Sequence, residues 1–350
     1  MRVPPGLHLE YVSPAEYQAA GWDDVLGVAS FNSAPDNGAH EDEIPFARVR
    51  TRVLAAQNGY EVWRTDKPAA SGRHERVSFR HTEDMLFGCI AIAESEVAAE
   101  SLRSRRAAGA SALQEVTAQA YREICATLDA QAYPHLLRVW NYLRDINGDS
   151  AGTERYRLFN SARQHALRAC GRAVTGSVPA ASALGAASDS PLVVYFLAGR
   201  TAPVFVENPR QVSAYHYPRQ YGSHSPAFSR AALVRQGGAL TLFVSGTSSI
   251  VGHRSLHAGD SAAQTRETLA NIEALLGEAN RVGPGARFSL GALACKVYVR
   301  RPQDLPVVQA ELAATLGLRA QVLYLQADIC RQDLLVEIEA TAVSPLAGAA

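Results

Sequence analysis

The sequence lacks any apolar run near the ~20 residues that a helix needs to cross a bilayer. Its start, MRVPPGLHLEYV, lacks the basic and apolar blocks of a signal peptide. It also lacks a net charge, because 34 Lys and Arg balance 34 Asp and Glu, so no overall field attracts nucleic acid or an anionic membrane. We therefore expect a soluble, cytoplasmic protein that binds neither nucleic acid nor a membrane.

Motifs of metal, disulfide and nucleophilic chemistry are missing as well. The five cysteines are scattered and form no CxxC pair, which is typical of free thiols in a reducing compartment. His253 and His257 have an HxxxH spacing without the glutamate of HExxH, so we interpret them as surface or hydrogen-bonding residues. No P-loop, dinucleotide fingerprint or GxSxG motif is present. The sequence thus predicts neither a metal site nor a serine hydrolase.

The C-terminal third alternates between strand and helix patterns. β-Branched and apolar runs predict strands at 239–246, 294–301, 320–328 and 333–343, and apolar residues at helical spacing predict helices at 261–280 and 302–317. This order indicates an α+β fold in which helices pack on one face of a mixed β-sheet.

The first half resembles the second in the order of its elements. A strand at 87–94, a helix at 111–130 and a strand at 135–145 repeat the later pattern, which suggests an internal duplication. The small residues of 173–191 are typical of a linker. We expect an N-terminal α+β domain at 1–150, a central segment with substrate-binding loops at 151–238, and a C-terminal domain carrying the catalytic strand at 239–345.

Two carboxylates stand out in the last predicted strand, within QADICRQDLLVEIEATAV at 326–343. Glu337 and Glu339 share one face of that strand, because side chains on a strand alternate with period two. One interpretation is a half-buried strand whose acidic face looks into water. The other places one carboxyl in a cleft, where burial raises its pKa and keeps it protonated as a general acid. The residues alone leave both open.

Arginines and aromatic residues gather in three other segments. The loop YHYPRQYGSHSPAFSRA at 215–231 is rich in both, and arginines recur in RYR at 155–157 and YVRR at 298–301. Guanidinium groups bind carboxylates in a bidentate way, so these segments could hold a dianionic small molecule. Alternatively, the loop is a rigid surface connection and each arginine pairs with a surface acid. SGTSS at 245–249 is either a polar turn or a backbone site for an anion.

Six segments together resemble the chorismatases, and the C-terminal half separately resembles the RidA/YjgF proteins. The segments are RYRLFNSARQHAL, VPAASALG, YHYPRQYGSHSPAFSRA, LFVSGTSSIVGH, QTRETLANIEALL and ADICRQDLLVEIEA. The resemblance implies RidA/YjgF-like (chorismate-mutase-like) units and an enzyme of shikimate-derived metabolism. It implies removal of the enolpyruvyl side chain of chorismate as pyruvate, with no metal or organic cofactor.

The resemblance also implies roles for individual residues. Glu337 is the expected proton donor, and Glu339 either supports it or lies beyond the cleft. A cysteine seven residues before that glutamate is typical of the hydroxybenzoate-forming branch, and Cys330 holds this position, although a buried inert thiol is the alternative. Ser248 departs from the small apolar residue or glycine of the best-known branches, which suggests both 3- and 4-hydroxybenzoate as products. Expected substrate contacts are Arg157, Tyr215, Arg219, Tyr221, Gly246, Ser248 and Arg300.

Other functions and more than one assembly remain open from the sequence. A hydrolytic chorismatase would release 3,4-dihydroxycyclohexa-1,5-diene carboxylate with pyruvate. A RidA-like imine deaminase and a non-catalytic binder of aromatic acids are the further alternatives. RidA-like proteins assemble as trimers, and a duplicated chain could mimic part of that assembly, so we expect a monomer or a homotrimer.

Overall fold

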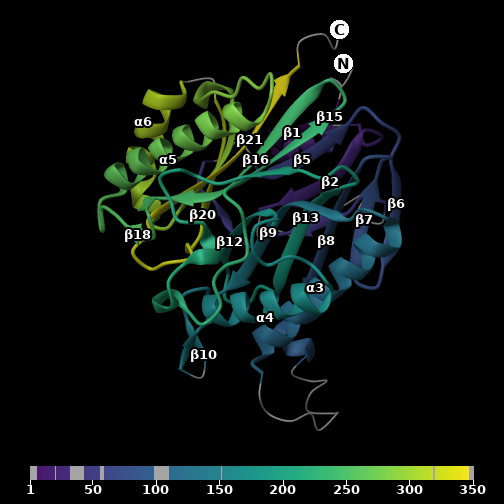
Figure 1. Ribbon diagram of the computed structural model, residues 1–350, viewed down its shortest axis with the longest axis horizontal. Coiled ribbons are helices and arrows are strands. Elements are labelled where there is room, and N and C mark those ends of the chain that lie inside the picture. The colour runs from purple at the N-terminus through teal and green to yellow at the C-terminus, as the bar shows by residue number, and fades with distance from the viewer. Residues whose placement is uncertain are drawn as a thin grey trace.

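The computed structural model describes residues 6–19, 21–31, 43–55, 59–97, 110–150, 152–317 and 320–346. Three β-sheets of four, six and seven strands dominate this part of the chain. The two larger sheets each carry helices on one face (Figure 1). The mixed α+β class expected from the sequence is therefore confirmed.

The six-stranded sheet comes from the first 200 residues. Its strands, in spatial order, are β12 (Ala180–Ala186), β9 (His135–Arg144), β13 (Leu192–Gly199), β8 (Met85–Ile92), β7 (Val77–His81) and β6 (Ala70–His74). Helices α3 (Ala112–Gln131) and α4 (Arg155–Ala169) cover one face. Ser111 begins α3 with a capping box, in which its side chain and that of Gln114 each accept the other residue's backbone N–H.

The seven-stranded sheet is mostly C-terminal. Its strands, in spatial order, are β14 (Val204–Val206), β15 (Ala231–Gln236), β16 (Ala239–Ser248), β21 (Val336–Pro345), β19 (Ala294–Val299), β20 (Gln321–Gln326) and β4 (Arg52–Val53). Helices α5 (Ser261–Val282) and α6 (Leu305–Leu316) pack on its outer face. These elements confirm the strands and helices that the C-terminal pattern predicts.

A smaller sheet and short elements complete the described fold. The four-stranded sheet has the order β1 (Leu7–Val12), β5 (Tyr60–Thr65), β2 (Val25–Ser30) and β3 (Phe46–Arg48). Helix α1 (Pro14–Ala19) packs beside it through Tyr17. Two hairpins, β10 (Asp149–Ser150) with β11 (Thr153–Glu154) and β17 (Ile250–Val251) with β18 (Arg254–Ser255), lie outside the sheets.

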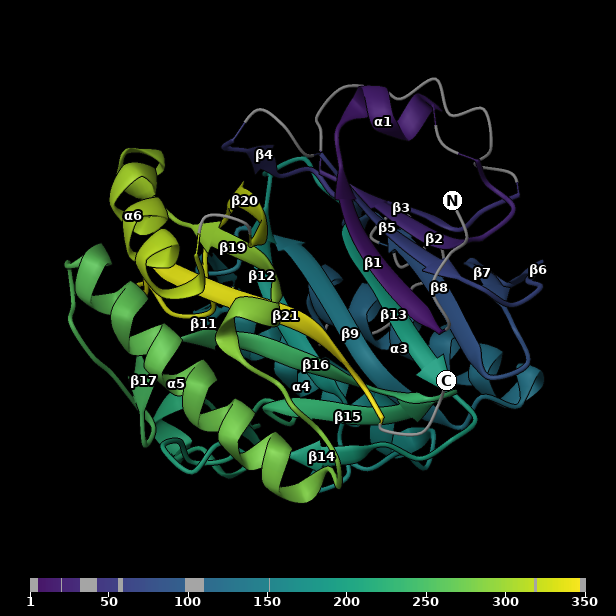
Figure 2. The ribbon, with the colours of Figure 1, turned by 90° about the horizontal axis from the view of Figure 1, so that it is seen from above.

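The inner faces of all three sheets meet in one shared core. It holds large side chains from each sheet, such as Trp63 of β5, Trp140 of β9 and Phe243 of β16. Figure 2 shows β21 and β16 on one side of this region, β9 and β13 in the middle, and β1 and β5 on the other. The inward face of β21, which carries Glu337 and Glu339, is therefore turned toward the six-stranded sheet.

The order of elements supports the expected repetition. The series β8, α3, β9 in the first half matches β16, α5, β19 in the second. Residues 135–145, whose pattern fits a helix or a strand, form the strand β9 as expected. The division into three segments at residues 150 and 238 stays a prediction, and β12 and β13 of the central segment pair with β9 and β8 of the first.

The expectation of a linker at 173–191 is wrong in part, because residues 180–186 form β12. This strand runs parallel to β9, with Ser182 opposite Trp140 in the register. Its small side chains let it approach the loop between β20 and β21 closely: a Cβ on Gly185 would lie 2.8 Å from Asp328 Cβ. Alanine, serine and glycine have low strand propensity, so pattern analysis misses a strand selected for close packing.

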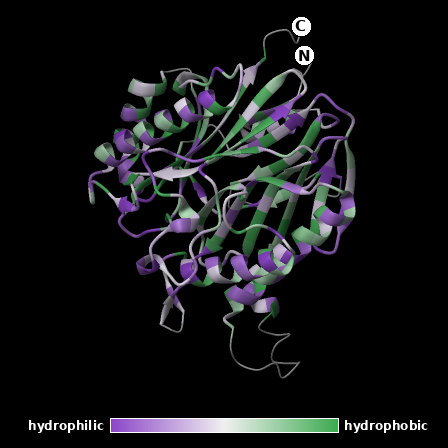
Figure 3. Cartoon of the chain, viewed as in Figure 1, coloured by the Kyte–Doolittle hydropathy of each residue, from purple (hydrophilic) through white to green (hydrophobic). Residues whose placement is uncertain are grey.

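Hydrophobic side chains are concentrated in the strands. Figure 3 shows mainly hydrophobic strands in the two large sheets, while the helices mix hydrophobic and hydrophilic residues. None of the helices in the described ranges combines the length and the apolar character that crossing a membrane requires.

Candidate active site

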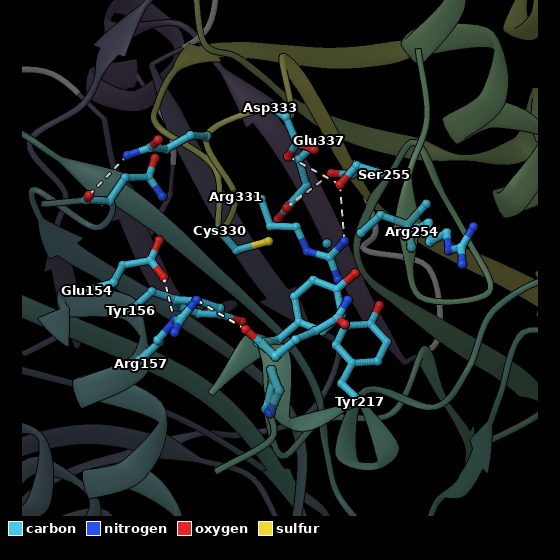
Figure 4. Close-up of a pocket in the computed structure, with 18 of the residues that line it drawn as sticks. Glu154, Tyr156, Arg157, Tyr217, Arg254, Ser255, Cys330, Arg331, Asp333 and Glu337 are labelled. Atoms are coloured by element: carbon cyan, nitrogen blue, oxygen red, sulfur yellow. Dashed lines mark hydrogen bonds and ion pairs between the residues drawn. The ribbon is translucent and has the colours of Figure 1, made fainter. Parts of the chain in front are cut away.

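A cavity of about 990 Å³ lies beside the end of the β16–β21 pair. Its wall includes side chains from the start of α4, the loop at 215–231, the β17–β18 hairpin and the loop before β21. Glu337, Cys330, Arg331 and Tyr217 contribute to this wall (Figure 4). Phe228 also lines the cavity. Segments far apart in the sequence thus converge on one concave site, the usual setting for a small-molecule ligand.

Glu337 is a buried carboxyl on the cavity wall. Only 4% of the residue is exposed, and Ser248 Oγ donates to its Oε2 at 3.3 Å. A Cβ on Gly246 would lie 2.0 Å from Glu337 Oε1, so glycine at 246 leaves the room that the carboxyl occupies. Burial, followed by the charge of Glu339, raises the pKa of Glu337 from 4.5 to about 8. Glu337 therefore carries a proton at neutral pH.

Glu339 has a different environment on the same face of β21. Its carboxylate accepts hydrogen bonds from Arg138 Nη2 at 2.7 Å, Trp140 Nε1 at 2.6 Å and Ser182 Oγ at 2.6 Å. Lys296 Nζ lies 2.9 Å from its Oε1. Burial alone would raise the pKa of Glu339, but Lys296, Arg138 and the Ser182 hydroxyl hold it below its usual value.

The interpretation of a solvent-facing acidic strand is wrong. Glu337 and Glu339 are both 4% exposed, and the opposite face of β21, with Val336 and Ile338, packs under α5 and α6. Two neighbouring carboxyls are thus kept in opposite protonation states by their surroundings. Such a pair is a frequent arrangement in acid–base chemistry.

SGTSS at 245–249 is not a polar turn, because most of it continues β16. The β16–β21 register shifts between Val244 and Thr247, which marks a bulge at Ser245 and Gly246. Ser245 Oγ accepts from the Ala181 N–H at 2.9 Å, and Ser182 Oγ accepts from the Gly246 N–H at 3.0 Å. These contacts join β16 to β12 and occupy the Gly246 N–H that an anion would need.

Two arginines on the cavity wall have hydrogen-bonding capacity left over. The Arg331 guanidinium lies 4.1 Å from the Tyr221 ring centroid and 5.2 Å from that of Tyr217. Arg230 Nη2 donates to Tyr217 Oη at 2.8 Å. Arg331 Nη2 and Arg230 Nε are buried and have no hydrogen-bond partner within the described residues. Buried donors without partners are rare, so the pairing of these two guanidinium groups is incomplete. An anionic ligand in the cavity would meet both residues on its wall.

Four further residues of the predicted site line the cavity. They are Arg157, Tyr221, Gly246 and Ser248, which join Glu337 and Cys330 there. Arg157 is at the rim, where its Nε donates to Glu154 Oε2 at 3.2 Å and its Nη2 donates to the Gln220 carbonyl at 3.3 Å. Tyr221 Oη donates to the His253 carbonyl at 2.7 Å.

The remaining three predicted contacts lie away from the cavity wall. Tyr215 packs against the core under α3 and α4, and Arg219 is exposed. Arg300 donates to the carbonyls of Leu334, Ile329 and Arg331 at 2.7, 3.1 and 2.8 Å, so it secures the loop before β21 from behind. The arginine and aromatic content of their segments favoured these positions, and it does not reveal which way each side chain points.

Cys330 is half-buried on the cavity wall. Burial and the neighbouring Glu337 raise the pKa of its thiol to about 12. It is therefore a neutral thiol at physiological pH, with the shape and polarity of a small apolar group and no nucleophilic thiolate.

Sequence reasoning missed Arg331, Arg230, Tyr217, Phe228 and Tyr156 as cavity residues. Some signals were present, since Arg331 directly follows the candidate cysteine and three of the others belong to the loop at 215–231. The histidines behave as expected: His253 contacts Tyr221 and His257 contacts Glu267.

Comparisons with known proteins agree on one family. The family model described as chorismatase FkbO/Hyg5-like, N-terminal, matches residues 61–198. A 3-hydroxybenzoate synthase of Streptomyces hygroscopicus is 34% identical over 90% of this chain and 90% of its own. A chorismatase of Streptomyces rapamycinicus is 37% identical over 91% of this chain and 92% of its own. A crystal structure of a chorismatase has a TM-score of 0.85, with 30% identity, 97% of this chain covered and 98% of that one. The chain belongs to the chorismatase family.

Proposed function

We propose that this protein cleaves the enolpyruvyl ether of chorismate and releases pyruvate with 3-hydroxybenzoate, 4-hydroxybenzoate or both. The name of one relative, 3-hydroxybenzoate synthase, favours the 3-isomer. The observation that carries the proposal is the Glu337 carboxyl, which stays protonated at neutral pH on the wall of a cavity lined by arginines.

Cleavage of an enol ether begins with a proton. Glu337 gives its proton to the terminal methylene carbon of the enolpyruvyl group, which generates an oxocarbenium ion beside the new carboxylate of Glu337. A pKa near the working pH suits this role, because the acid is then largely protonated and still able to give the proton up. The Glu337 carboxylate and the carboxylate of the enolpyruvyl group stabilise the cation. In this proposal Glu337 supplies the proton and one of the two carboxylates, and the substrate supplies the other.

The rest of the cavity suits a dianion with a ring. Arg331 and Arg230 are cavity-wall guanidinium groups that would donate hydrogen bonds to the carboxylate oxygens of chorismate. Phe228, Tyr217 and Tyr156 supply apolar surface for the cyclohexadiene ring. Arg157, at the rim and already paired with Glu154, would assist entry more than binding.

Atom balance separates the two product outcomes. Hydroxybenzoate and pyruvate together contain all the atoms of chorismate, so this route consumes no water, whereas the hydrolytic route to the diene diol consumes one. Cys330, neutral and close to Glu337, fills space that an attacking water would use. The ring hydroxyl then captures the cation in place of solvent and loses its proton, which gives a cyclic ketal. One ring C–O bond of the ketal and the bond from its other oxygen to the pyruvate carbon then break. Pyruvate leaves with one oxygen, the second oxygen stays on the ring, and loss of a ring proton gives the aromatic acid.

The test is to incubate the purified protein with chorismate, measure pyruvate by a coupled assay and identify the ring product by chromatography. Pyruvate and hydroxybenzoate in equal amounts are expected. Pyruvate with the diene diol would place the protein in the hydrolytic branch. No pyruvate above the spontaneous rate would overturn the proposal and leave imine deamination or aromatic-acid binding to be examined.

A further inference from the structure

A buried ionic cluster that the proposed chemistry does not use directly joins the three sheets. Lys296 of β19 contacts Glu61 of β5 and lies 2.9 Å from Glu339 of β21. Arg138 of β9 lies 2.7 Å from the other oxygen of Glu339. The four side chains are between 0% and 5% exposed. Two cations and two carboxylates thus form a cluster with no net charge in the core.

Such a cluster is an expensive way to stabilise a fold. Taking four charged groups out of water carries a large desolvation penalty, and well-packed apolar side chains often stabilise a core as well or better. A role other than stability is therefore the better explanation. The position of Glu339 indicates what that role is, because side chains two residues apart on one strand face are about 7 Å apart. The nearest titratable neighbour of Glu339 along β21 is Glu337.

A chain of contacts links the cluster to the site of Glu337. Ser182 Oγ donates to Glu339 Oε2 at 2.6 Å and accepts the Gly246 N–H at 3.0 Å. Gly246 in turn sits against the carboxyl of Glu337, with room for no side chain of its own. Glu339 thereby fixes, through Ser182, the bulge of β16 against which the Glu337 carboxyl rests.

We propose that Glu339 is a positioning residue for Glu337: its fixed negative charge keeps the proton on Glu337, while Ser182 holds the Gly246 bulge against the carboxyl. Lys296, paired on its far side with Glu61, and Arg138 keep Glu339 ionised. The inference rests on the proposed function only in taking Glu337 as the acid.

Other groups around Glu337 do not supply the same effect. The charged and titratable side chains that face it from neighbouring elements are Arg138 of β9, Arg230 before β15, Tyr298 of β19, Tyr156 of α4, and Cys330 and Arg331 of the loop before β21. Arg138 and Arg230 act to lower the pKa of Glu337. Tyr156, Tyr298 and Cys330 have raised pKa values and stay neutral. Burial and Glu339 are left to hold the proton.

The experiment is an infrared titration of the protein without substrate. The band of the protonated Glu337 carboxyl is identified by its loss in Glu337→Gln, and its pH midpoint is then followed. Glu339→Gln should lower the midpoint by about one pH unit or more, because a buried charge about 7 Å away is removed. Glu339→Asp keeps the charge and should leave the midpoint within a few tenths of a unit of the wild type.

Glu61→Gln is the matched control. It removes the same charge from the same cluster, but from the far side of Lys296, so both variants leave one surplus positive charge. We expect Glu61→Gln to move the midpoint much less than Glu339→Gln. An unchanged midpoint in Glu339→Gln, or an equal shift in both variants, would overturn the inference.

Two further readouts keep the test decisive. If Glu339→Gln does not fold, the charge-balanced Glu339→Gln/Lys296→Met variant takes its place and should still lower the midpoint. A fall of about one pH unit in the midpoint of Glu339→Asp would contradict the inference. The alkaline limb of kcat/KM should shift with the infrared midpoint. Absence of pyruvate from the wild type, with the infrared shift intact, would refute the proposed function alone.

Discussion

At the scale of single residues, the site depends on how β21 and β16 present their side chains. Glu337 is opposite Ser248 in the register, and the bulge at Ser245 and Gly246 comes just before Thr247, which pairs with Ile338. This bulge brings a residue without a side chain against Glu337 Oε1. The protonated acid is thus placed by backbone geometry as much as by polar contacts.

Gly246→Ala tests this placement. The new Cβ would lie 2.0 Å from Glu337 Oε1, so the carboxyl must move, and a displacement of about 1 Å from productive geometry lowers kcat about 10²-fold. Gly277→Ala in α5 is the control, since a Cβ there meets nothing within 4 Å. The measurement is the kcat of both variants in steady-state kinetics. A wild-type kcat in Gly246→Ala would show that the close approach of Gly246 to the Glu337 carboxyl does not position the acid.

Cys330→Ala tests product choice. Removing the thiol opens space for water beside Glu337, so the ratio of hydroxybenzoate to pyruvate should fall while pyruvate is still released. Cys170→Ala, which changes a half-buried cysteine outside the cavity wall, should leave the ratio unchanged. Identical product ratios and rates in Cys330→Ala and the wild type would show that Cys330 is an inert thiol with no role in product choice.

At the scale of elements, the loop at 327–335 is the segment on which the site most depends. Arg300 holds its backbone from behind through three carbonyls, and Arg331 extends from it to the Tyr217 and Tyr221 rings. Arg331 Nη1 also donates to Ser255 Oγ of the β17–β18 hairpin at 3.1 Å. Three loops are therefore fastened together around one guanidinium.

Arg331→Met should weaken chorismate binding, seen as a higher KM, by about 2 to 3 kcal/mol. The variant lacks the guanidinium group on the cavity wall that would donate hydrogen bonds to a substrate carboxylate. Arg219→Met is the control, because this side chain is exposed and outside the cavity wall. Equal KM values for Arg331→Met and the wild type would show that the carboxylate binds elsewhere.

Sequence patterns were sufficient for elements with strong periodicity and insufficient where distant segments meet. The strands β16, β19 and β21 and the helix α5 were predicted from their own residues. β12 was not, because its small residues are explained only by the facing sheet. The pairing of Glu337 and Glu339 on one face was predictable. Their opposite protonation was not, since it depends on residues 138, 182 and 296.

At the scale of the whole molecule, the buried acid couples folding to pH. In the unfolded chain Glu337 ionises near its ordinary pKa of 4.5, whereas in the folded protein its pKa is about 8. The folded state therefore binds the proton more tightly, and between these two values the free energy of unfolding falls by up to about 1.4 kcal/mol per pH unit. Above the folded pKa this loss levels off.

Glu337→Gln removes this titration. The free energy of unfolding of the variant, minus that of the wild type, should rise by several kcal/mol from pH 5 to pH 8. The wild type loses stability over this range because its unfolded chain releases the Glu337 proton, and the amide of the variant has no such proton to release. Urea denaturation of both proteins at the two pH values measures the difference. A difference that is the same at pH 5 and pH 8 would mean that Glu337 is ionised in the folded protein.

The choice between monomer and homotrimer stays a prediction at this scale.

The measurement that bears most directly on Glu337 as the acid is pyruvate release from chorismate by the wild type and Glu337→Gln, with chorismate binding to each measured by calorimetry. We predict that the variant binds chorismate within roughly tenfold of the wild type and that its turnover is nearly abolished, because the amide keeps the shape and has no proton to give. Retention of more than about a tenth of the wild-type kcat would remove Glu337 from the role of proton donor.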